Sequence, residues 1–419
     1  QSVAYTLRQI DNTDGLSNSA VLSLAQDETG RLWIGTCDGL NLFDGREVTF
    51  FGRTPSEPRL TGELISALTY CPDGHMWIST NYGLNKFSRL DNEMLSFTQF
   101  QEMRNLSLNG RNHMFVVSRG NAVFYNVSGV SDNFEHLQGL ALGRSEVLGI
   151  KALDDRLLVF TAGGVATCAL SFSDNSYKAG SLEFLIRGEI SDCFIHDGEI
   201  LLLYADGNVA AFDPATLSTR PVTDISQLIG SRGHVSDMLV DSRGRLFVSF
   251  DNSGVVRLTP RNGDNDMPES YEVEDIGVKG GAFCLLSDRN QDIVWIGSDG
   301  NGVYIYVDDD YSFRTFSNAD LGSRISRPIR AIFIDRSGTL WLGTKGDGML
   351  RIPRFNPWSR GDELHPESVT AANSALVNNF VYAFASGPGD GFWIGSDGGV
   401  NFASGTDGRI WRVAVGEPI

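Results

Sequence analysis

The segment DETGRLWIGTCDGLNLF, residues 27–43, decides the fold of this chain. It contains a turn of Asp and Gly, an apolar run around a tryptophan, a second Gly-rich turn and another apolar run. Clear copies of the pattern begin at Pro72, Asp241, Gln291, Asp335 and Asp390, and weaker copies fill the middle of the chain. A pattern that recurs roughly every 20–50 residues predicts a repeat array or a propeller.

One position of the repeat recurs at intervals of 38 to 52 residues. It is occupied in turn by Trp33, Trp77, Phe115, Leu158, Leu202, Phe247, Trp295, Trp341 and Trp393. Five of the seven tryptophans therefore fall on this single position. A large ring in the middle of a strand can wedge between neighbouring blades and bury about 150–250 Å². We expect these residues to have a structural role and not to bind a ligand.

Each repeat unit contains four short predicted strands. In the first unit these are AVLSLAQD, RLWIGT, GLNLFD and EVTFFG, denoted strands A to D, and turn residues separate them. Short apolar runs that end at Gly, Asp or Asn are typical of strands, and no segment shows helical periodicity with caps at both ends. The sequence therefore predicts an all-β chain made of propeller blades.

A propeller must close, because an open ring leaves an unpaired edge strand. The segment YTLRQI, residues 5–10, resembles the outer strands of the repeats and can complete the seventh blade, which is centred on Trp295. Residues 1–310 then form a seven-bladed ring. YSFRTF, residues 311–316, repeats the role of YTLRQI, so residues 311–419 are expected to begin a second, incomplete propeller with two blades. The alternative is one large ring of eight or nine blades.

Charge and composition exclude several classes of protein. The 34 Lys and Arg against 52 Asp and Glu give a net charge of -18, which repels phosphate backbones and makes nucleic acid an unexpected partner. The longest apolar runs are too short to span a bilayer. The N-terminal QSVAYTLRQI lacks a basic segment followed by an apolar one, so we expect any signal peptide to be gone already. Five scattered cysteines suggest neither a zinc site nor a disulfide framework.

The segment DGLSNSAVLSLAQDETGRLWIGTCDGLNLFDG, residues 14–45, resembles the two-component regulator propeller repeat. Related copies run along nearly the whole chain. The resemblance implies the periplasmic sensor region of a hybrid two-component system, in which two seven-bladed propellers precede an immunoglobulin-like domain, a membrane helix, a histidine kinase and a response regulator. It also implies an oligosaccharide ligand, control of polysaccharide-utilisation genes, a downstream kinase region in the same protein, a membrane anchor only beyond this region, and a possible homodimer.

The residues themselves indicate no catalytic site, no cofactor and no metal site. The six histidines are scattered, and no metalloprotease, nucleophile-elbow, phosphate-loop or dinucleotide motif occurs. DRSGTLW, residues 335–341, resembles the Asp-box turn of sialidases, which is itself structural. The acidic segments NGDNDMPE (262–269) and VDDD (307–310) lack the spacing of a known calcium loop, so solvated turns are expected there. We expect this region not to be an enzyme.

Ligand contacts are expected in the loops that join strand B to strand C, since these loops and the D-to-A connections share one face of a propeller. Loops on a rigid scaffold often carry function, although Asp and Asn also serve turn geometry. The candidate ligand-binding residues are Asp38, Asn81, Tyr82, Arg119, Asn121, Asp299, Asn301, Lys345 and Asp347. Tyr82 is the only aromatic residue among these loops, and the long connection at residues 51–64 is a second candidate wall.

Three functions stay open from the residues alone: a ligand-sensing module, a protein-interaction scaffold, and a propeller hydrolase or lyase that acts on polysaccharide. Propellers host many functions, so the fold does not choose between them. The family resemblance favours the periplasmic oligosaccharide sensor.

Overall fold

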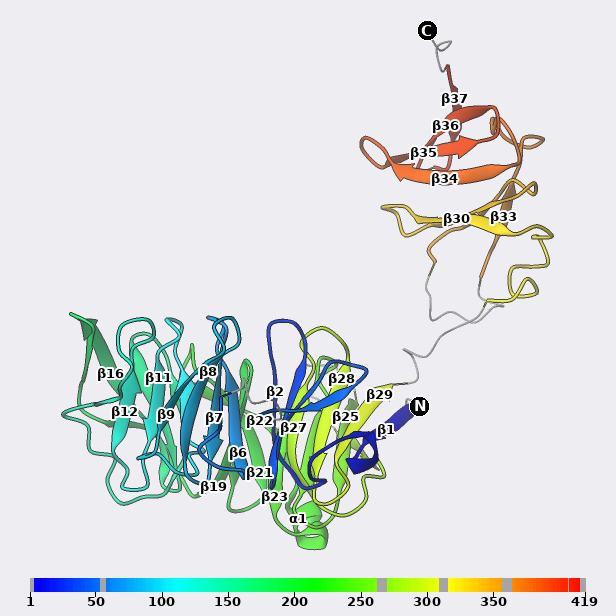
Figure 1. Cartoon of the computed structure of the whole chain (residues 1–419). Coiled ribbons are helices and arrows are strands. Elements are labelled where there is room, and N and C mark those ends of the chain that lie inside the picture. Colours follow the sequence, from blue (N-terminus) through cyan, green and yellow to red (C-terminus); the bar gives the residue numbers. More distant parts are fainter. Residues whose placement is uncertain are drawn as a thin grey trace. The chain divides into compact units, whose positions relative to one another are not determined.

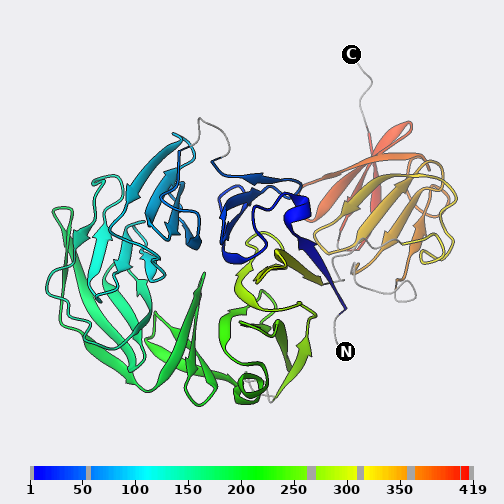
Figure 2. The same ribbon diagram turned by 60° about the horizontal axis from the view of Figure 1, so that its bottom comes forward.

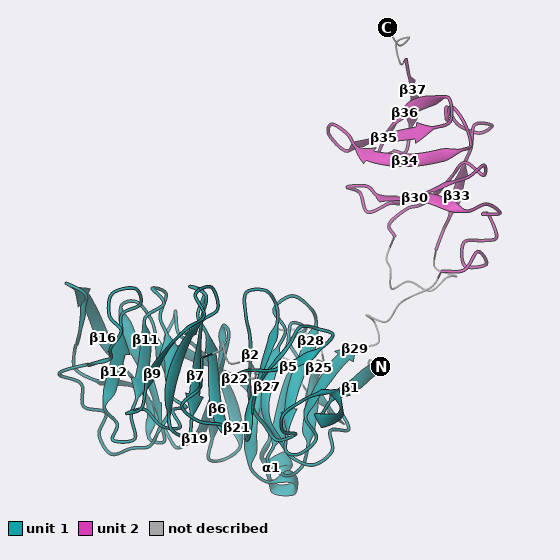
Figure 3. Ribbon diagram, in the orientation of Figure 1, with its two compact units in different colours: residues 1–309 teal, residues 310–419 magenta. Residues whose placement is uncertain are grey.

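The computed structural model describes residues 4–52, 58–261, 270–308, 316–355, 364–405 and 407–414. Their strands pair into nine separate antiparallel sheets, eight with four strands and one with five (Figure 1). The prediction of an all-β chain built from four-stranded blades is confirmed. The chain divides into two compact units, residues 1–309 and 310–419 (Figure 3).

Unit 1 contains seven blades, and except in blade 7, whose outer strand is β1, their strands follow in chain order from the inside of the ring to the outside. Blade 1 consists of β2 (Val21–Gln26), β3 (Leu32–Thr36), β4 (Gly39–Phe43) and β5 (Val48–Phe50). Blade 2 consists of β6 (Ile65–Tyr70), β7 (His75–Thr80), β8 (Gly83–Ser88) and β9 (Glu93–Phe97). Blade 3 consists of β10 (Leu106–Leu108), β11 (Met114–Val117), β12 (Val123–Asn126) and β13 (Glu135–His136).

The five-stranded blade 4 consists of β14 (Val147–Ala152), β15 (Arg156–Thr161), β16 (Gly164–Ser173), β17 (Ser176–Ala179) and β18 (Glu183–Arg187). Blade 5 consists of β19 (Ile190–His196), β20 (Glu199–Tyr204), β21 (Asn208–Asp213) and β22 (Ser218–Asp224). Blade 6 consists of β23 (Val235–Val240), β24 (Leu246–Phe250), β25 (Val255–Arg261) and β26 (Ser270–Asp275). Blade 7 consists of β27 (Ala282–Ser287), β28 (Ile293–Ser298), β29 (Val303–Asp308) and β1 (Tyr5–Ile10).

The N-terminal strand closes the ring of unit 1, as the sequence predicts. β1 pairs antiparallel with β29 from Tyr5–Asp308 to Ile10–Val303, so the first strand of the chain is the outer strand of the last blade. Figure 2 shows the N-terminal blade, in blue, beside the last blade of unit 1, in yellow-green. Seven separate apolar clusters fill the seven interfaces between neighbouring blades. Unit 1 is therefore a closed seven-bladed propeller and not part of a larger ring.

The repeated aromatic position lies in the interface with the following blade. Trp33 packs against Ile65 and Phe87 of blade 2, and Trp295 packs against Val21 of blade 1 across the closure. In unit 1 this position is buried in every blade, including the four without tryptophan. The predicted structural role is confirmed for all seven.

A buried asparagine in strand C explains the Gly-Leu-Asn signature of the best repeats. The Asn41 amide accepts the backbone N–H of Ser17 at 3.1 Å and donates to the Ser17 hydroxyl at 2.8 Å. Asn85 makes the same two bonds with Thr61, at 3.3 and 2.9 Å. Both asparagines are fully buried. Each one ties the connection that enters a blade to the middle of that blade.

Strand A carries a bulge near its start in eight of the nine blades, blade 3 being the exception. A bulge re-aims the side chain beside it. Next to the bulge, the Ser23 hydroxyl donates to the Ile65 carbonyl of the following blade at 3.0 Å. The bulge thus directs a polar side chain across the interface, close to the ring axis.

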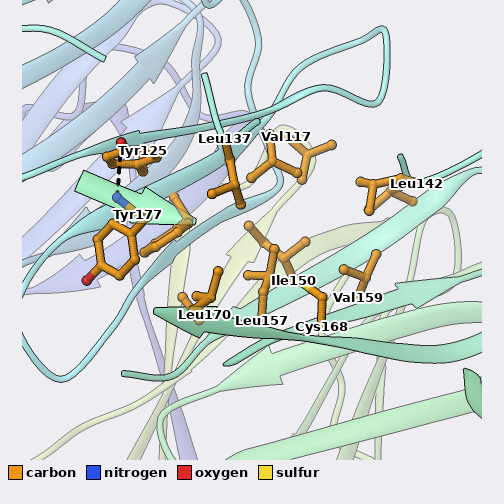
Figure 4. Packing of buried hydrophobic residues seen from close by; sticks show 14 of the residues in the cluster. Val117, Tyr125, Leu137, Leu142, Ile150, Leu157, Val159, Cys168, Leu170 and Tyr177 are labelled. Carbon is orange, nitrogen blue, oxygen red and sulfur yellow. Dashed lines mark hydrogen bonds between the residues drawn. The ribbon is translucent and has the colours of Figure 1, made fainter. Parts of the chain in front are cut away.

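Blade 4 departs from the repeat because β16 is ten residues long. Its first half pairs with the outer strand β18, and its second half pairs with the additional strand β17. This hairpin reaches blade 3, where the Tyr177 hydroxyl accepts a hydrogen bond from Asn109 at 2.7 Å and the Tyr177 N–H donates to Tyr125. Figure 4 shows the apolar cluster between these blades, with Val117 and Leu137 on one side and Leu157, Cys168 and Leu170 of blade 4 on the other.

Unit 2 contains two blades. Blade 8 consists of β30 (Ile329–Ile334), β31 (Leu340–Thr344), β32 (Met349–Ile352) and β33 (Glu367–Val369). Blade 9 consists of β34 (Val381–Ser386), β35 (Gly391–Ser396), β36 (Gly399–Ser404) and β37 (Ile410–Val413). Trp341 is fully buried between them, but Trp393 remains 37% exposed, so the expectation of a buried wedge is wrong at this one position. Among the described residues, no further blade covers its ring.

Two short helices occur where the sequence predicts strands and turns only. α1 (Ser226–Arg232) joins blades 5 and 6, and the 3-10 helix η1 (Asn12–Asp14) precedes blade 1. The periodicity of α1 is too short to detect, and its Leu228 and Ile229 pack on the cluster between these blades. The predicted opening strand of the second ring, residues 311–316, lies outside the described residues except for Phe316, as does the acidic segment 262–269.

Candidate functional site

The B-to-C loops of unit 1 all lie on one face of the ring, because strands A and C run opposite to strands B and D. Seven of the nine candidate residues belong to this face: Asp38, Asn81, Tyr82, Arg119, Asn121, Asp299 and Asn301. Lys345 and Asp347 belong to blade 8 in unit 2. The candidates therefore belong to two different units.

Two candidates in unit 1 use their side-chain amides to hold loops together. Asn121 donates to the carbonyls of Gly143 and Ser145, both at 3.1 Å. Asn301 donates to the Lys279 carbonyl at 3.0 Å. In each case a B-to-C turn is fastened to a D-to-A connection.

Asp347 has the same kind of role in unit 2. Its carboxylate accepts the backbone N–H groups of Ser326 at 2.7 Å and Arg327 at 2.8 Å, as well as the Ser326 hydroxyl. Burial by itself would raise the pKa of Asp347, but these hydrogen bonds outweigh it and hold the pKa below its usual value. Its acceptor capacity is largely used within the loop.

Four other candidates project into solvent: Asp38, Tyr82, Asp299 and Lys345. Tyr82 is 62% exposed, which is unusual for a large aromatic side chain. Asp38 and Asp299 belong to the neighbouring blades 1 and 7. Partial burial raises the pKa of the Cys37 thiol, and the negative charges of Asp299 and then Asp38 raise it further. Among the candidates, blades 7, 1 and 2 thus present two exposed carboxylates and one exposed aromatic ring.

Arg119 forms an ion pair that the sequence analysis missed. Its guanidinium donates to the Glu102 carboxylate at 2.8 Å, and both side chains are exposed. Glu102 lies in the D-to-A connection between blades 2 and 3, a segment without any repeat signature. Only the ring geometry brings this connection beside the B-to-C loop of the next blade.

Near the ring axis, a half-buried carboxylate links three consecutive blades. Asp237 on β23 accepts His196 Nε2 of blade 5 at 2.8 Å and the Leu285 N–H of blade 7 at 2.8 Å. Burial lowers the pKa of His196, but the Asp237 carboxylate more than offsets this and raises it above the usual value. Among the described residues no cluster of His, Cys, Asp and Glu can hold a metal ion. The arrangement acts as a cross-blade tie.

In the VDDD segment Asp308 is a buried strand residue, so the expectation of a solvated turn is wrong there. Asp308 is fully buried and accepts both terminal nitrogens of Arg245 at 2.9 Å, as well as the Tyr306 hydroxyl at 2.7 Å. These ion-pair bonds occupy the oxygens that a calcium ion would need. Asp309 and Asp310 lie outside the described residues.

A cavity of about 260 Å³ lies on blade 4. It is lined by Asp155, Arg156, Thr167, Ala169, Gly180, Ser181 and Glu183. Asp155 and Arg156 follow the A-to-B turn, so the cavity lies toward the face opposite to the B-to-C loops. It is polar, and no aromatic residue lines it. Separately, no described helix has the length and apolar character that crossing a membrane requires.

The family of the repeats follows from a match in both units. The family model of the two component regulator propeller matches residues 15–38 and 323–346. The chain contains two component regulator propeller repeats. Each matched stretch runs from the lead-in of a blade through strands A and B into the B-to-C loop, in blade 1 and in blade 8.

Two similar proteins are a histidine kinase and the extracellular domain of a hybrid two component system. The chain is 39% identical to Histidine kinase P4 of Formosa agariphila over 57 residues. This stretch is 14% of this chain and 4% of the kinase. The extracellular domain of the hybrid two component system BT3049 from B. thetaiotaomicron aligns with a TM-score of 0.52 and 20% identity, over 99% of this chain and 55% of that domain. The chain thus spans about half the length of that extracellular domain.

An unrelated activity occurs on a similar scaffold. Virginiamycin B lyase from Staphylococcus aureus aligns with a TM-score of 0.50 and 11% identity, over 72% of this chain and 99% of the lyase. At such identities the likeness concerns the fold alone. The shared fold therefore does not assign the activity of the lyase to this chain.

Proposed function

We propose that this chain is a periplasmic ligand-sensing region of a hybrid two-component system, and that it binds an oligosaccharide to regulate polysaccharide-utilisation genes. The observation that carries the proposal is the presence of two component regulator propeller repeats in both units. The fold, which is similar to that of an extracellular two-component domain, agrees with it. The partner that receives the signal is a kinase region of the same protein, and the sensor acts as a homodimer.

The closed ring of unit 1 is suited to such a role. Its seven interfaces make a rigid scaffold, and the B-to-C loops display exposed polar groups and one exposed aromatic ring on a single face. Planar aromatic and hydrogen-bonding groups side by side are the combination that a sugar requires. The named residues offer contacts for a ligand without a catalytic constellation.

We also propose that residues 311–419 begin a second propeller. Ile332 is 69% exposed and Ile334 is 56% exposed on the inner strand of blade 8, and Trp393 is exposed on blade 9. The corresponding faces of unit 1 are covered by neighbouring blades. If a further blade packs on blade 9 in a longer chain, Trp393 should be protected there from quenching by acrylamide, whereas unchanged quenching would contradict the proposal.

A thermal-shift screen of the purified chain against oligosaccharides of defined linkage tests the sensing function. A ligand that binds only the folded state adds about 2.7 kcal/mol of stability at one hundred times its Kd, so a specific glycan must raise the unfolding temperature. Saturable binding without turnover supports the sensor. Cleavage of a glycan would instead identify a hydrolase or lyase. If no oligosaccharide raised the unfolding temperature, the oligosaccharide would be removed from the proposal, and a protein-interaction scaffold would remain.

A further inference from the structure

The two blades of unit 2 carry unusual residues at their strand-A bulges. In unit 1 the bulged residue is Leu, Ser or Phe in every blade that has one: Leu22, Ser66, Leu148, Ser191, Ser236 and Phe283. In unit 2 it is Arg330 in blade 8 and Tyr382 in blade 9. Bulges often lie beside functional sites and re-aim the side chains that they carry. A cation and an aromatic ring at two successive bulges therefore call for a functional explanation.

Arg330 and Tyr382 contact each other between the two blades. The Cζ atom of Arg330 lies 5.2 Å from the centroid of the Tyr382 ring, which is 44% exposed. Stacking uses the flat face of a guanidinium and leaves its N–H donors available in the plane. Within the described part of the chain, the Arg330 guanidinium has no hydrogen-bond or ion-pair partner. Its donors are therefore available to a planar or tetrahedral anion.

A second exposed aromatic ring lies two residues before Tyr382. Phe380 is 39% exposed and forms a β-bridge with Lys345 of the B-to-C loop of blade 8. A Cβ atom at Gly346 would meet the Phe380 ring at 3.6 Å and Cγ of Arg327 at 3.8 Å, so Arg327 reaches the same place. Since a residue spans at most about 3.6 Å of chain, the Cα atoms of Phe380 and Tyr382 lie within about 7 Å of each other. The two rings and the neighbouring cations thus share one small area of the B-to-C face of unit 2.

Hydrogen bonds between the loops hold the backbone of this area. The Lys345 N–H donates to the Pro328 carbonyl at 3.0 Å, and the Gly346 N–H donates to the Asn379 carbonyl at 3.1 Å. Both bonds tie the B-to-C loop of blade 8 to the connections that enter blades 8 and 9. A surface whose backbone is already ordered loses little entropy when a ligand binds.

The exposure of these rings is not explained by the free sides of blades 8 and 9. A further blade would cover the apolar side chains that unit 2 exposes on those sides. Arg330 and Tyr382, by contrast, join blade 8 to blade 9, as do Lys345 and Phe380. These four residues are therefore exposed at a junction between two described blades.

Charges of both signs occur on this face, but they are not equally available. The described charged residues in its loops and at the start of strand A are Asp320, Arg324, Arg327, Arg330, Lys345, Asp347 and Asp397. The carboxylates of Asp320 and Asp347 already accept hydrogen bonds from Ser317 and Ser326 in their own loops. No carboxylate in the described ranges forms an ion pair with Arg330 or Lys345. The groups that remain for direct contact with a charged ligand beside the two rings are therefore cations.

We propose that this area is a binding platform for an anionic sugar unit of an oligosaccharide, one that carries a carboxylate or a sulfate. The Arg330 guanidinium and the Lys345 ammonium donate to the anionic group, and the apolar face of the sugar ring packs on Phe380. Tyr382 holds the guanidinium in place by stacking. This inference rests on the proposed sensing function and adds the place in unit 2 and the class of ligand.

The test is isothermal titration of the whole chain with three kinds of oligosaccharide. Oligogalacturonate carries carboxylates only, carrageenan oligosaccharides carry sulfates only, and mannan oligosaccharides are neutral. An acidic oligosaccharide should bind, and added salt should weaken the binding. Whether oligogalacturonate or the carrageenan oligosaccharides bind more tightly identifies the anionic group as carboxylate or sulfate.

Substitutions locate the binding. Arg330→Gln and Lys345→Gln should each weaken the binding of the acidic ligand about tenfold, because each removes a charged donor. Tyr382→Phe should retain the binding, since a phenyl ring also stacks on a guanidinium. The matched control is Arg409→Gln, which removes an exposed positive charge from the C-to-D turn of blade 9, on the opposite face. Unchanged unfolding temperatures show that the variants are folded.

Other outcomes separate this inference from the function on which it rests. If an acidic oligosaccharide binds and the variants at Arg330 and Lys345 bind it as tightly as the wild type, the platform is wrong while the sensing function stands. Tighter binding of the neutral oligosaccharides overturns the proposed ligand class. If none of the oligosaccharides binds, the platform and the oligosaccharide-sensing function fail together.

Discussion

At the residue scale, a single carboxylate organises the turn of blade 1. Asp27 Oδ1 accepts the N–H groups of Thr29 and Arg31, and Oδ2 accepts the Trp33 indole N–H at 2.9 Å and Arg89 at 2.7 Å. Burial by itself would raise the pKa of Asp27, but the bonds from Trp33 and Thr29 outweigh it and lower the pKa. One side chain therefore links the turn, the wedge residue and the neighbouring blade.

The same position differs between blades. Asp335 accepts the Trp341 indole N–H at 2.8 Å in blade 8. In blade 2 the equivalent residue is Cys71, and the indole N–H of Trp77 has no partner among the described residues. Blades 1 and 2 thus allow a comparison of the turn with its carboxylate, Asp27, and without it, at Cys71.

We expect Asp27→Ala to lower the free energy of unfolding of unit 1 by about 3 kcal/mol, because several buried donors lose their acceptor. Cys71→Ala should cost about 1 kcal/mol or less, since that thiol makes only weak hydrogen bonds. Urea unfolding followed by circular dichroism measures both losses. Equal losses at the two positions would show that the carboxylate does not organise the turn.

At the element scale, the asparagine of strand C fastens each well-formed blade to the connection before it. In blade 9 the Asn401 amide repeats the arrangement, accepting the Val377 N–H at 2.9 Å and donating to the Ala375 carbonyl at 2.9 Å. The chain segments involved are 24 and 26 residues apart. The strand motif is visible in the sequence, but the partner of the asparagine is not, because the intervening connections differ in length and composition.

Asn85→Ala should destabilise unit 1 by about 2 kcal/mol, because the buried Thr61 N–H loses its acceptor and the Ile78 carbonyl loses a donor. The exposed Asn252, in the B-to-C turn of blade 6, is the matched control, and Asn252→Ala should change the stability little. Thermal unfolding of the two variants compares them directly. A loss at Asn252 as large as that at Asn85 would contradict the role of the buried amide.

At the scale of the whole molecule, the closing blade carries a buried ion-pair cluster. Asp308 lies opposite Tyr5 of β1, and the Tyr5 ring stacks on Tyr306 at 5.0 Å. Arg245 of blade 6 spans from Asp241 to Asp308, so blade 6, blade 7 and the closing strand meet at one carboxylate. Burial would raise the pKa of Asp308, but the hydrogen bonds from Arg245 and Tyr306 more than offset it and lower the pKa.

This shift predicts a loss of stability in acid. The folded pKa of Asp308 lies below its unfolded value, so the stabilisation is complete above about pH 4 and declines as the pH falls through the folded pKa. Asp73, whose pKa is lowered to about 2 by bonds from Cys71, Ser128 and His75 that outweigh burial, adds to the same trend. The unfolding temperature of unit 1 should therefore fall steeply between about pH 4 and pH 2.

Asp308→Asn separates this cluster from the general effect of acid. At neutral pH it should cost about 3–5 kcal/mol, because the Arg245 charge is left buried without its partner. Its stability should also depend less on pH below about pH 4 than that of the wild type. Asp299→Asn, at an exposed position, should leave both properties unchanged. If the stability of Asp308→Asn fell with pH as steeply as that of the wild type, the Asp308 cluster would not explain the loss of stability in acid.

The sequence by itself determined the blade, its four strands and the nine copies of the repeat, and it indicated the closing role of residues 5–10, which the pairing of β1 with β29 then decided. These features follow from local patterns, namely alternating apolar runs, turn residues and a period near 44 residues, and each copy repeats the signal. The tertiary structure alone decided the Glu102–Arg119 pair, the tie from His196 through Asp237 to Leu285, and the hairpin of blade 4 that reaches Tyr125. Those contacts join residues from different blades, and the ring geometry sets which side chains meet there, so no local pattern records them.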